Sequence, residues 1–391
     1  MATPAVEGAI GSLQGVRIID LTTNVAGPWA TQILGDLGAD VIKVERDTGD
    51  DTRGWGPPFW PGSEESVSFS ALNRSKRSIV LDLKSDEGKA TLDKLIAGAD
   101  VVIQNMRSGA FDRLGYSWER LQELNSDLVY ADMSGFGHVG PRSQEPAYDP
   151  LMQAYSGVMS LTGEDGRPPV RIPVSVLDKG TGMWAVIGIF DALRQRDAGQ
   201  GGTHLQFSLL ETALSWIPGQ LLGHILTGRV PRRLGSATPG IAPYQAFESA
   251  DGYLIVAAGN QRIWERLCEV LERPDFVEDD RYLDNSSRFQ NLTELSEDLT
   301  KVFRTRITDD WIKRLQAAQV PCSPINTVDK VVDDEQVQAL GAIDRLPHPA
   351  GGHEYGVVHL PIRRGGDYHA IERLAPGLDE HGEEIRAELD D

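Results

Sequence analysis

Strand and helix patterns alternate along the first third of the chain, and this alternation restricts the fold more than any other feature. The β-rich runs 16–21 (VRIIDL) and 40–45 (DVIKVE) flank a helical segment that begins at Pro28 and ends before Gly38. A strand, a helix and a second strand in this order form the unit of parallel α/β sheets. Further strand patterns, with helices between them, lie at 78–83, 100–103 and 128–133. The chain therefore predicts an α/β fold with an open, doubly wound parallel sheet.

The loops at the carboxyl ends of these strands are the expected place for a ligand. They begin at Thr22, Arg46, Lys84, Asn105 and Ser134. Basic residues gather on and near these loops, although the chain carries a net charge of −20. The cluster is Arg46, Arg53, Arg74, Lys76, Arg77, Lys84, Arg107 and Arg113. Charge and topology together favour a site for a phosphate-bearing ligand, and ordinary solvated surface charge is the alternative.

The length of 391 residues exceeds what one ordinary core can fill, so we expect two domains. The large domain is predicted to take residues 1–200, and residues 331–391 are predicted to return to it. A linker helix is expected within 201–227. A smaller α+β domain is expected over 228–330, with paired strands at 244–248 and 253–258 followed by helices near 262–271, 292–303 and 308–318.

Composition and motifs argue against several classes of function. The negative charge opposes nucleic-acid binding. Cys268 and Cys322 have neither disulfide-framework nor zinc spacing, which fits a cytoplasmic protein without a metal site. No apolar run is long enough to span a membrane, and no signal peptide is expected. The letters GFGHVG at 135–140 open no helix, so a nicotinamide cofactor is not expected, and no motif indicates another permanently bound cofactor.

The segment 174–191 (VSVLDKGTGMWAVIGIFD) places an aspartate at the start of an apolar helix. Asp178 follows a β-branched run, and Gly180 and Gly182 follow it in the first turn. Asp178 could be an N-cap, or it could be a carboxylate nucleophile at a cleft that small residues keep open to substrate. Spacing alone favours the cap, because aspartate is a preferred cap residue.

Four segments in the same order resemble the class III CoA-transferases, the group that includes formyl-CoA transferase, carnitine CoA-transferase and α-methylacyl-CoA racemase. They are DLTTNVAGPWATQILGDLGADVIKVER (20–46), NRSKRSIVLDLK (73–84), QNMRSGAFDRLG (104–115) and VLDKGTGM (176–183). The resemblance implies a large Rossmann-like domain, a small domain and a homodimer of two interlocked chains. It also implies that coenzyme A enters as the substrate acyl-CoA, with a free carboxylic acid as the second substrate.

The resemblance makes Asp178 the expected nucleophile, a role compatible with capping. The residues expected to contact coenzyme A are Val25, Ala26, Arg46, Leu81, Lys84, Asn105, Met106, Arg107 and Arg113. Those expected to position substrate are Ser134, Tyr148, Asp149, Gly180 and Gly182, with amides around the two glycines as candidate oxyanion donors. The expected reaction moves CoA from an acyl-CoA to a carboxylic acid through an aspartyl mixed anhydride and an aspartyl-CoA thioester.

Two departures from the family's patterns bear on the substrate. Residues 235–247 read GSATPGIAPYQAF where the formyl-CoA members carry a run of glycines, which argues against a formyl or oxalate substrate. Tyr148 and Asp149 stand where the racemases carry histidine and aspartate, so the second base of a racemase is missing. An acyl-CoA racemase or isomerase, with Asp178 as its base, remains the first alternative. A non-catalytic acyl-CoA-binding protein is the second.

Overall fold

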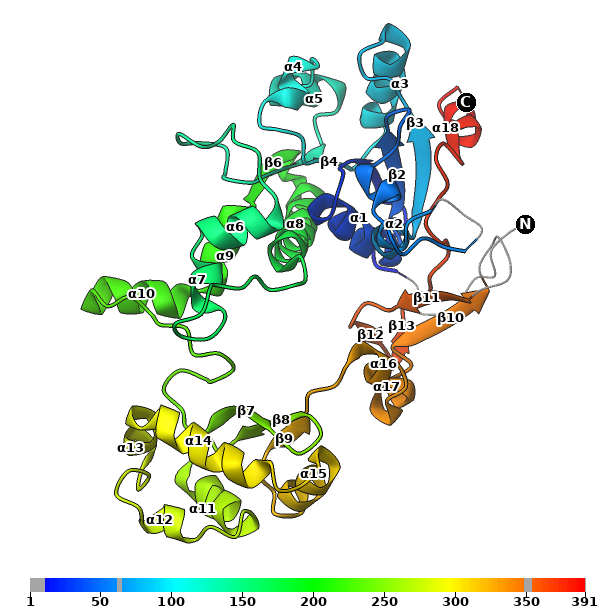
Figure 1. Ribbon diagram of the computed structural model, residues 1–391. Helices are drawn as coiled ribbons and strands as arrows, with labels where there is room; N and C mark the ends of the chain where they lie inside the picture. The colour runs from blue at the N-terminus through cyan, green and yellow to red at the C-terminus, as the bar shows by residue number, and fades with distance from the viewer. Residues whose placement is uncertain (1–10, 62–64, 348–353, 391) are drawn as a thin grey trace. The chain divides into compact units, whose positions relative to one another are not determined.

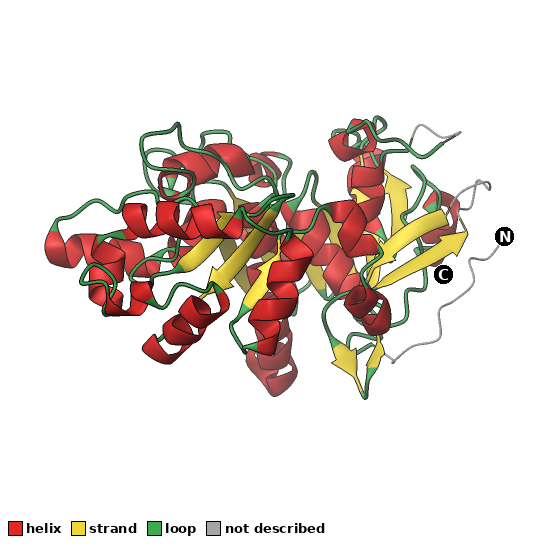
Figure 2. Ribbon diagram, turned by 60° about the horizontal axis from the view of Figure 1, so that its bottom comes forward, coloured by secondary structure: helices red, strands yellow, loops and turns green. Residues whose placement is uncertain are grey.

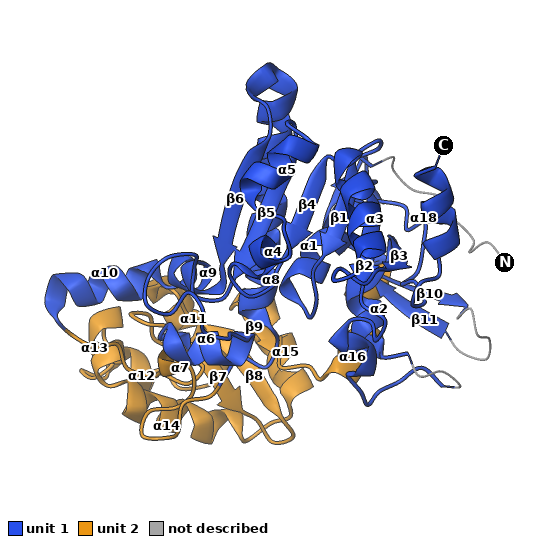
Figure 3. Cartoon of the chain, turned by 90° about the horizontal axis from the view of Figure 1, so that it is seen from above, with its two compact units in different colours: residues 1–158, 171–228, 340–391 blue, residues 159–170, 229–339 orange. Residues whose placement is uncertain are grey.

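The computed structural model describes residues 11–61, 65–347 and 354–390. Contacts divide the chain into two compact units, coloured separately in Figure 3. Unit 1 takes the described residues of 1–158, 171–228 and 340–391, and unit 2 takes 159–170 and 229–339. Among the described residues, no helix has the length and apolar character needed to cross a membrane.

Six parallel strands form the sheet of unit 1 (Figure 1). They are β1 (Arg17–Leu21), β2 (Asp40–Glu45), β3 (Lys76–Val80), β4 (Val101–Gln104), β5 (Val129–Ser134) and β6 (Thr203–Ser208). Their order is β3-β2-β1-β4-β5-β6. The chain adds β2 and β3 on one side of β1 and then β4, β5 and β6 on the other side, so the switch point lies between β1 and β4. The expected α/β fold with a parallel sheet is confirmed. The sixth strand comes from the region 201–227, which is therefore more than a linker helix.

Helices cover both faces of this sheet, and Figure 2 shows them in red against the yellow strands. Helices α1 (Ala26–Asp36) and α8 (Val176–Gln195) share one core with alternate strand residues such as Ile18 and Val101. The other core joins Ile19 and Val102 to the helices α3 (Asp86–Ala97), α4 (Ala110–Arg113), α5 (Trp118–Leu124) and α18 (Gly382–Glu388). Burial on both faces explains why apolar residues occupy successive positions in strands such as β4 (VVIQ).

The remaining elements of unit 1 surround the sheet. They are η1 (Asp51–Gly54), α2 (Val67–Asn73), α6 (Asp149–Tyr155), η2 (Arg196–Gln200), α9 (Leu209–Trp216), α10 (Pro218–Thr227), β10 (Ile343–Pro347), β11 (Glu354–Val358), β12 (Arg363–Arg364) and β13 (Asp367–Tyr368). Ion pairs from Arg77 to Glu384 and Glu388 bind the C-terminal helix α18 to β3.

Unit 2 has its own antiparallel sheet of β7 (Tyr244–Glu248), β8 (Tyr253–Ala257) and β9 (Cys322–Pro324). The pairing of β7 with β8 confirms the predicted hairpin. A core that includes Trp264, Phe303 and Trp311 packs against it. The helices assigned to unit 2 are α11 (Gln261–Val270), α12 (Asp275–Glu278), α13 (Asn285–Gln290), α14 (Leu292–Phe303), α15 (Thr308–Ala317) and α16 (Val328–Val332); α7 (Val158–Leu161) and α17 (Glu335–Leu340) straddle the boundaries between the units.

Candidate active site

A cavity of about 490 Å³ opens where β1, β4 and β5 end, and we call it the Asp178 cavity. Its walls come from the loops after these strands, the segment 143–150 and the start of α8. This is the switch point of the strand order, where open α/β sheets bind ligands. Nine of the expected site residues line it: Val25, Ala26, Asn105, Met106, Arg107, Ser134, Tyr148, Asp149 and Asp178.

A second cavity, of about 600 Å³, lies at the carboxyl ends of β1, β2 and β3, and we call it the β2–β3 cavity. Arg46, Leu81 and Lys84 line it. Thr23 and Met106 line both cavities, so the loops after β1 and β4 adjoin each of them.

Three expected site residues line neither cavity. Arg113 is exposed at the end of α4. Gly180 and Gly182 are buried and allow α8 to approach its neighbours. A Cβ at Gly182 would lie 2.6 Å from the carbonyl oxygen of Ala26, and one at Gly180 would lie 2.9 Å from the ring of Trp216. Both glycines also lie beyond the first turn of α8, where amides bond within the helix, so they are not oxyanion donors.

The basic cluster divides into two groups. Four of its members are held in ion pairs: Arg53 with Glu45, Arg74 with Asp36, Lys76 with Asp20, and Arg77 with Asp40. Carboxylates of the fold already bind these four side chains, so their expected place in a phosphate site is corrected. Arg46, Lys84, Arg107 and Arg113 are exposed, and only Arg46 has an ion-pair partner, Asp51, among the described residues. Exposed cations near the strand ends remain available to an anionic ligand.

Asp178 occupies the third position of α8, and its expected role as N-cap is wrong. Ser175 is the cap residue, and its side chain makes no capping hydrogen bond. A carboxylate from another helix caps α8 instead. Asp149 Oδ2 accepts hydrogen bonds from the backbone amides of Leu177, at 2.7 Å, and Asp178, at 3.2 Å. Asp149 Oδ1 accepts a further bond from Gln153 at 2.6 Å. Within the described parts of the chain, the Asp178 carboxylate has no hydrogen-bond donor and is left for the cavity.

The pKa of Asp178 is raised to about 7, first by burial and then by the negative charge of Asp149. Burial disfavours the charged form, and a like charge nearby disfavours it further. The carboxylate form of Asp178 is therefore populated near neutral pH but poorly stabilised. A group with this combination of cavity position and shifted pKa is a candidate catalytic residue.

Several other residues that line the Asp178 cavity were not predicted from the sequence, among them Trp55, Glu145, Arg171 and Ser175. Arg171 is exposed and makes no ion pair with a described residue. It belongs to a proline-rich stretch without a recognisable local pattern, so only the fold brings it to the cavity.

Known proteins share this architecture. Residues 13–382 match the profile of CoA-transferase family III. The chain is 38% identical over 383 residues to the succinate–glutarate CoA-transferase of Agrobacterium fabrum, covering 97% of this chain and 96% of that protein. It is 36% identical over 344 residues to the human succinyl-CoA:glutarate CoA-transferase, covering 88% and 78%. A crystal structure of a CaiB/BaiF family protein from Brucella suis superposes with a TM-score of 0.89 at 39% identity, covering 98% of this chain and 100% of that one.

The protein is an enzyme that transfers coenzyme A, as the sequence predicted. The chain belongs to CoA-transferase family III.

Proposed function

We propose that the protein moves CoA from an acyl-CoA to a free carboxylic acid through covalent intermediates on Asp178. The observation that carries this mechanism is the carboxylate of Asp178, which faces a cavity at the sheet's switch point without a hydrogen-bond donor among the described residues. A carboxylate suits the reaction because it can accept an acyl group and return it.

The reaction proceeds by four exchanges. An Asp178 oxygen attacks the donor thioester, the C–S bond breaks, and a mixed anhydride and CoA thiolate form. The thiolate attacks the aspartyl carbonyl, the anhydride C–O bond breaks, and the donor acid leaves as a carboxylate. The acceptor carboxylate attacks the aspartyl thioester and expels CoA thiolate again. The thiolate attacks the acceptor's carbonyl, which gives the new acyl-CoA and regenerates Asp178. The thioester energy is retained throughout.

Asp149 raises the free energy of ionised Asp178 through its negative charge. Acylation makes Asp178 neutral, so this repulsion is relieved as the first bond forms. A reaction is accelerated only by effects that favour the transition state over the ground state. The repulsion between Asp149 and Asp178 decreases as the bond forms, so its loss lowers the activation free energy. Asp149 thus contributes to the chemistry while it caps α8.

The two cavities together suit an extended ligand. We place the phosphates of CoA near Arg46 and Lys84 of the β2–β3 cavity and the thioester in the Asp178 cavity. The pantetheine arm would then pass Thr23 and Met106, which line both. Arg113 is exposed at the end of α4 and lines neither cavity, so its contact with CoA stays a prediction from the resemblance.

We assign a dicarboxylic acid as the acceptor. Two relatives carry succinate or succinyl-CoA and glutarate in their names. The Asp178 cavity already contains the carboxyl groups of Asp149 and Asp178, so an incoming acid with two negative charges needs a cation there. Arg171 is an exposed cation on the cavity wall, and its planar guanidinium matches a carboxylate.

We also propose a homodimer. Large apolar side chains are exposed along three helices of unit 1: Met183, Trp184 and Ile187 on α8, Trp216 on α9, and Leu222, Ile225 and Leu226 on α10. A surface of this kind is typical of a protein interface. Interlocked chains would not separate without unfolding, so sedimentation at nanomolar concentration should show no folded monomer; a compact monomer would contradict this arrangement.

Product analysis tests the proposed function. The protein is incubated with succinyl-CoA and a panel of mono- and dicarboxylic acids, and new CoA thioesters are followed by mass spectrometry. We expect transfer to dicarboxylic acids, loss of transfer in Asp178→Ala, and a raised KM for the dicarboxylic acid in Arg171→Gln. Transfer by Asp178→Ala at the wild-type rate would refute the mechanism. A preference for monocarboxylic acids would refute the acceptor class.

A further inference from the structure

The loop between β1 and α1 is held in place almost entirely by side chains from other segments. The amides of Thr22, Thr23 and Asn24 donate to Asp20, Asn105 and Asp50, at 2.9, 2.9 and 3.2 Å. The carbonyls of Thr22 and Thr23 accept from Lys43 and Asn105, at 2.8 and 2.7 Å. Neither strand nor helix bonding fixes these residues, so their conformation depends on the side chains around them.

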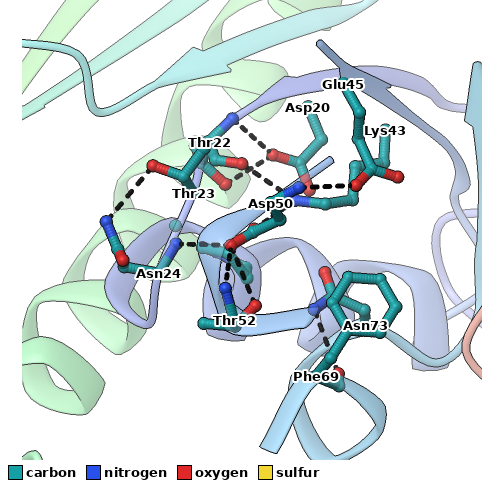
Figure 4. Close-up of polar contacts among 12 residues, drawn as sticks. Asp20, Thr22, Thr23, Asn24, Lys43, Glu45, Asp50, Thr52, Phe69 and Asn73 are labelled. Carbon is teal, nitrogen blue, oxygen red and sulfur yellow. Dashed lines mark hydrogen bonds and ion pairs between the residues drawn. The ribbon is translucent and has the colours of Figure 1, made fainter. Parts of the chain in front are cut away.

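Lys43 and Asp50 form the buried part of this support, shown in Figure 4. Their ion pair is 2.9 Å long, and both side chains are 0% exposed. Lys43 Nζ reaches the Thr22 carbonyl, and Asp50 Oδ1 reaches the Asn24 amide. Asp50 is itself fixed, because its Oδ1 also accepts from the amide and hydroxyl of Thr52. The pair therefore holds the loop at two points, with Lys43 contributed by β2 and Asp50 by the segment after it.

The positive charge of Lys43 is compensated by the carboxylates around it. Coulombic attraction to Asp20, Asp50 and Glu45 raises the pKa of Lys43 against the opposing effect of burial. Lys43 also helps to keep the pKa of Asp50 below its ordinary value. Both groups are consequently charged at neutral pH.

Stability alone does not account for such a pair. Replacing a buried ion pair by apolar residues is often neutral or stabilising, because desolvation offsets the attraction. What the pair does fix is a disfavoured backbone conformation: Asn24 has φ of 66°, in the left-handed region. Directly after it come Val25, the N-cap residue of α1, and Ala26, its first residue, and both line the Asp178 cavity.

We propose that Lys43 and Asp50 are positioning residues of the transferase, which hold the loop 22–26 where the pantetheine arm of CoA passes from the β2–β3 cavity to Asp178. The proposal rests on the proposed function for the path of CoA. Asp50 borders the β2–β3 cavity, but the side chains of Lys43 and Asp50 are both 0% exposed, so neither charged group contacts the ligand in this account. Their effect is on the pantetheine part of CoA that crosses the loop, whereas the phosphates are placed near Arg46 and Lys84.

The test compares two doubly substituted full-length proteins. Lys43→Met/Asp50→Asn removes both charges, so no uncompensated charge is buried. Arg74→Met/Asp36→Asn is the matched control, because this pair is also buried, with side chains 5% and 3% exposed, and it does not contact the loop. Calorimetry measures binding of CoA and of adenosine 3′,5′-bisphosphate, which lacks the pantetheine arm, and steady-state kinetics measures transfer.

We expect Lys43→Met/Asp50→Asn to weaken CoA binding at least about tenfold and to lower kcat, with the affinity for adenosine 3′,5′-bisphosphate within about twofold of the wild type. The control should bind both ligands like the wild type. Unchanged CoA binding, or equal weakening of both ligands, would overturn the proposal. Failure of the wild type to bind CoA would instead overturn the proposed function.

A milder pair of variants keeps the test decisive if the double substitution does not fold. Asn24→Ala and Asn24→Gly both remove the side chain, but only glycine adopts a positive φ freely. The alanine variant should bind CoA about fivefold more weakly than the glycine variant, from the cost of the left-handed conformation. Equal affinities would contradict a role for the loop's conformation.

Discussion

Replacing the nucleophile should stabilise the protein at neutral and alkaline pH. In the folded state the pKa of Asp178 is about 7, against an ordinary value of 3.8. A carboxyl group with a raised folded-state pKa binds its proton more tightly when folded. The free energy of unfolding of the wild type therefore falls as pH rises from the ordinary pKa of 3.8 through the folded-state pKa of about 7. Asp178→Asn has no ionisable group at this position, so its stability should not fall for this reason.

The magnitude follows from the size of the shift. Each pKa unit corresponds to about 1.4 kcal/mol, so a shift of about three units gives about 4 kcal/mol in full. Between about pH 5 and pH 8 the linkage relation yields roughly 2.5 kcal/mol of this. The stability of Asp178→Asn relative to the wild type should grow by that amount across this range.

Urea denaturation of the ligand-free protein, followed at several pH values and one protein concentration, measures the difference. Asp191→Asn is the control, because Asp191 is on the same helix but exposed, where solvent screens its charge. The reasoning is refuted if the stability difference between Asp178→Asn and the wild type stays constant with pH, or if Asp191→Asn reproduces its pH dependence.

Three further predictions concern the site and its support. The kcat/KM for transfer should rise with pH through about 7 as Asp178 ionises, and Asp149→Asn should move this limb to lower pH because it removes a repelling charge; an unmoved limb would contradict the coupling. Arg46→Ala should raise the KM for acyl-CoA about tenfold and weaken its salt dependence, with little change in the KM for the acid; initial rates at two ionic strengths decide this. Gly182→Ala should destabilise the protein by about 1–3 kcal/mol in urea denaturation, because its Cβ would lie 2.6 Å from the Ala26 carbonyl oxygen; wild-type stability would show that α8 has room to shift.

The sheet could be predicted because its strands are buried on both faces. Runs such as 40–45 contain adjacent β-branched residues, here Val41 and Ile42, which pack into the cores on opposite faces of the sheet. The same run shows the limit of that reasoning. Lys43 and Glu45 resemble solvent-facing positions of an alternating strand, yet both are buried in the polar cluster under the loop after β1. Their partners come from separate segments, and a local pattern does not reveal them.

The order of the strands and the resemblance of four segments predicted which residues gather around the Asp178 cavity, but they did not predict the electrostatics there. The residue that caps α8 and raises the pKa of Asp178 is Asp149, which lies 29 positions earlier in the chain. Likewise Arg74, expected among phosphate ligands, is neutralised by Asp36 from the end of α1. Long-range pairs of this kind depend on packing, so composition and spacing do not predict them.

Chemical trapping of the aspartyl thioester tests the central claim most directly. The protein is mixed with succinyl-CoA without acceptor and quenched with hydroxylamine, which attacks an aspartyl thioester, releases CoA and leaves an aspartyl hydroxamate, and the peptides are analysed by mass spectrometry. The account predicts a hydroxamate on Asp178 in the wild type and none in Asp178→Asn, which should still bind CoA. Transfer activity with an unmodified Asp178, or a hydroxamate on a different carboxylate, would contradict it.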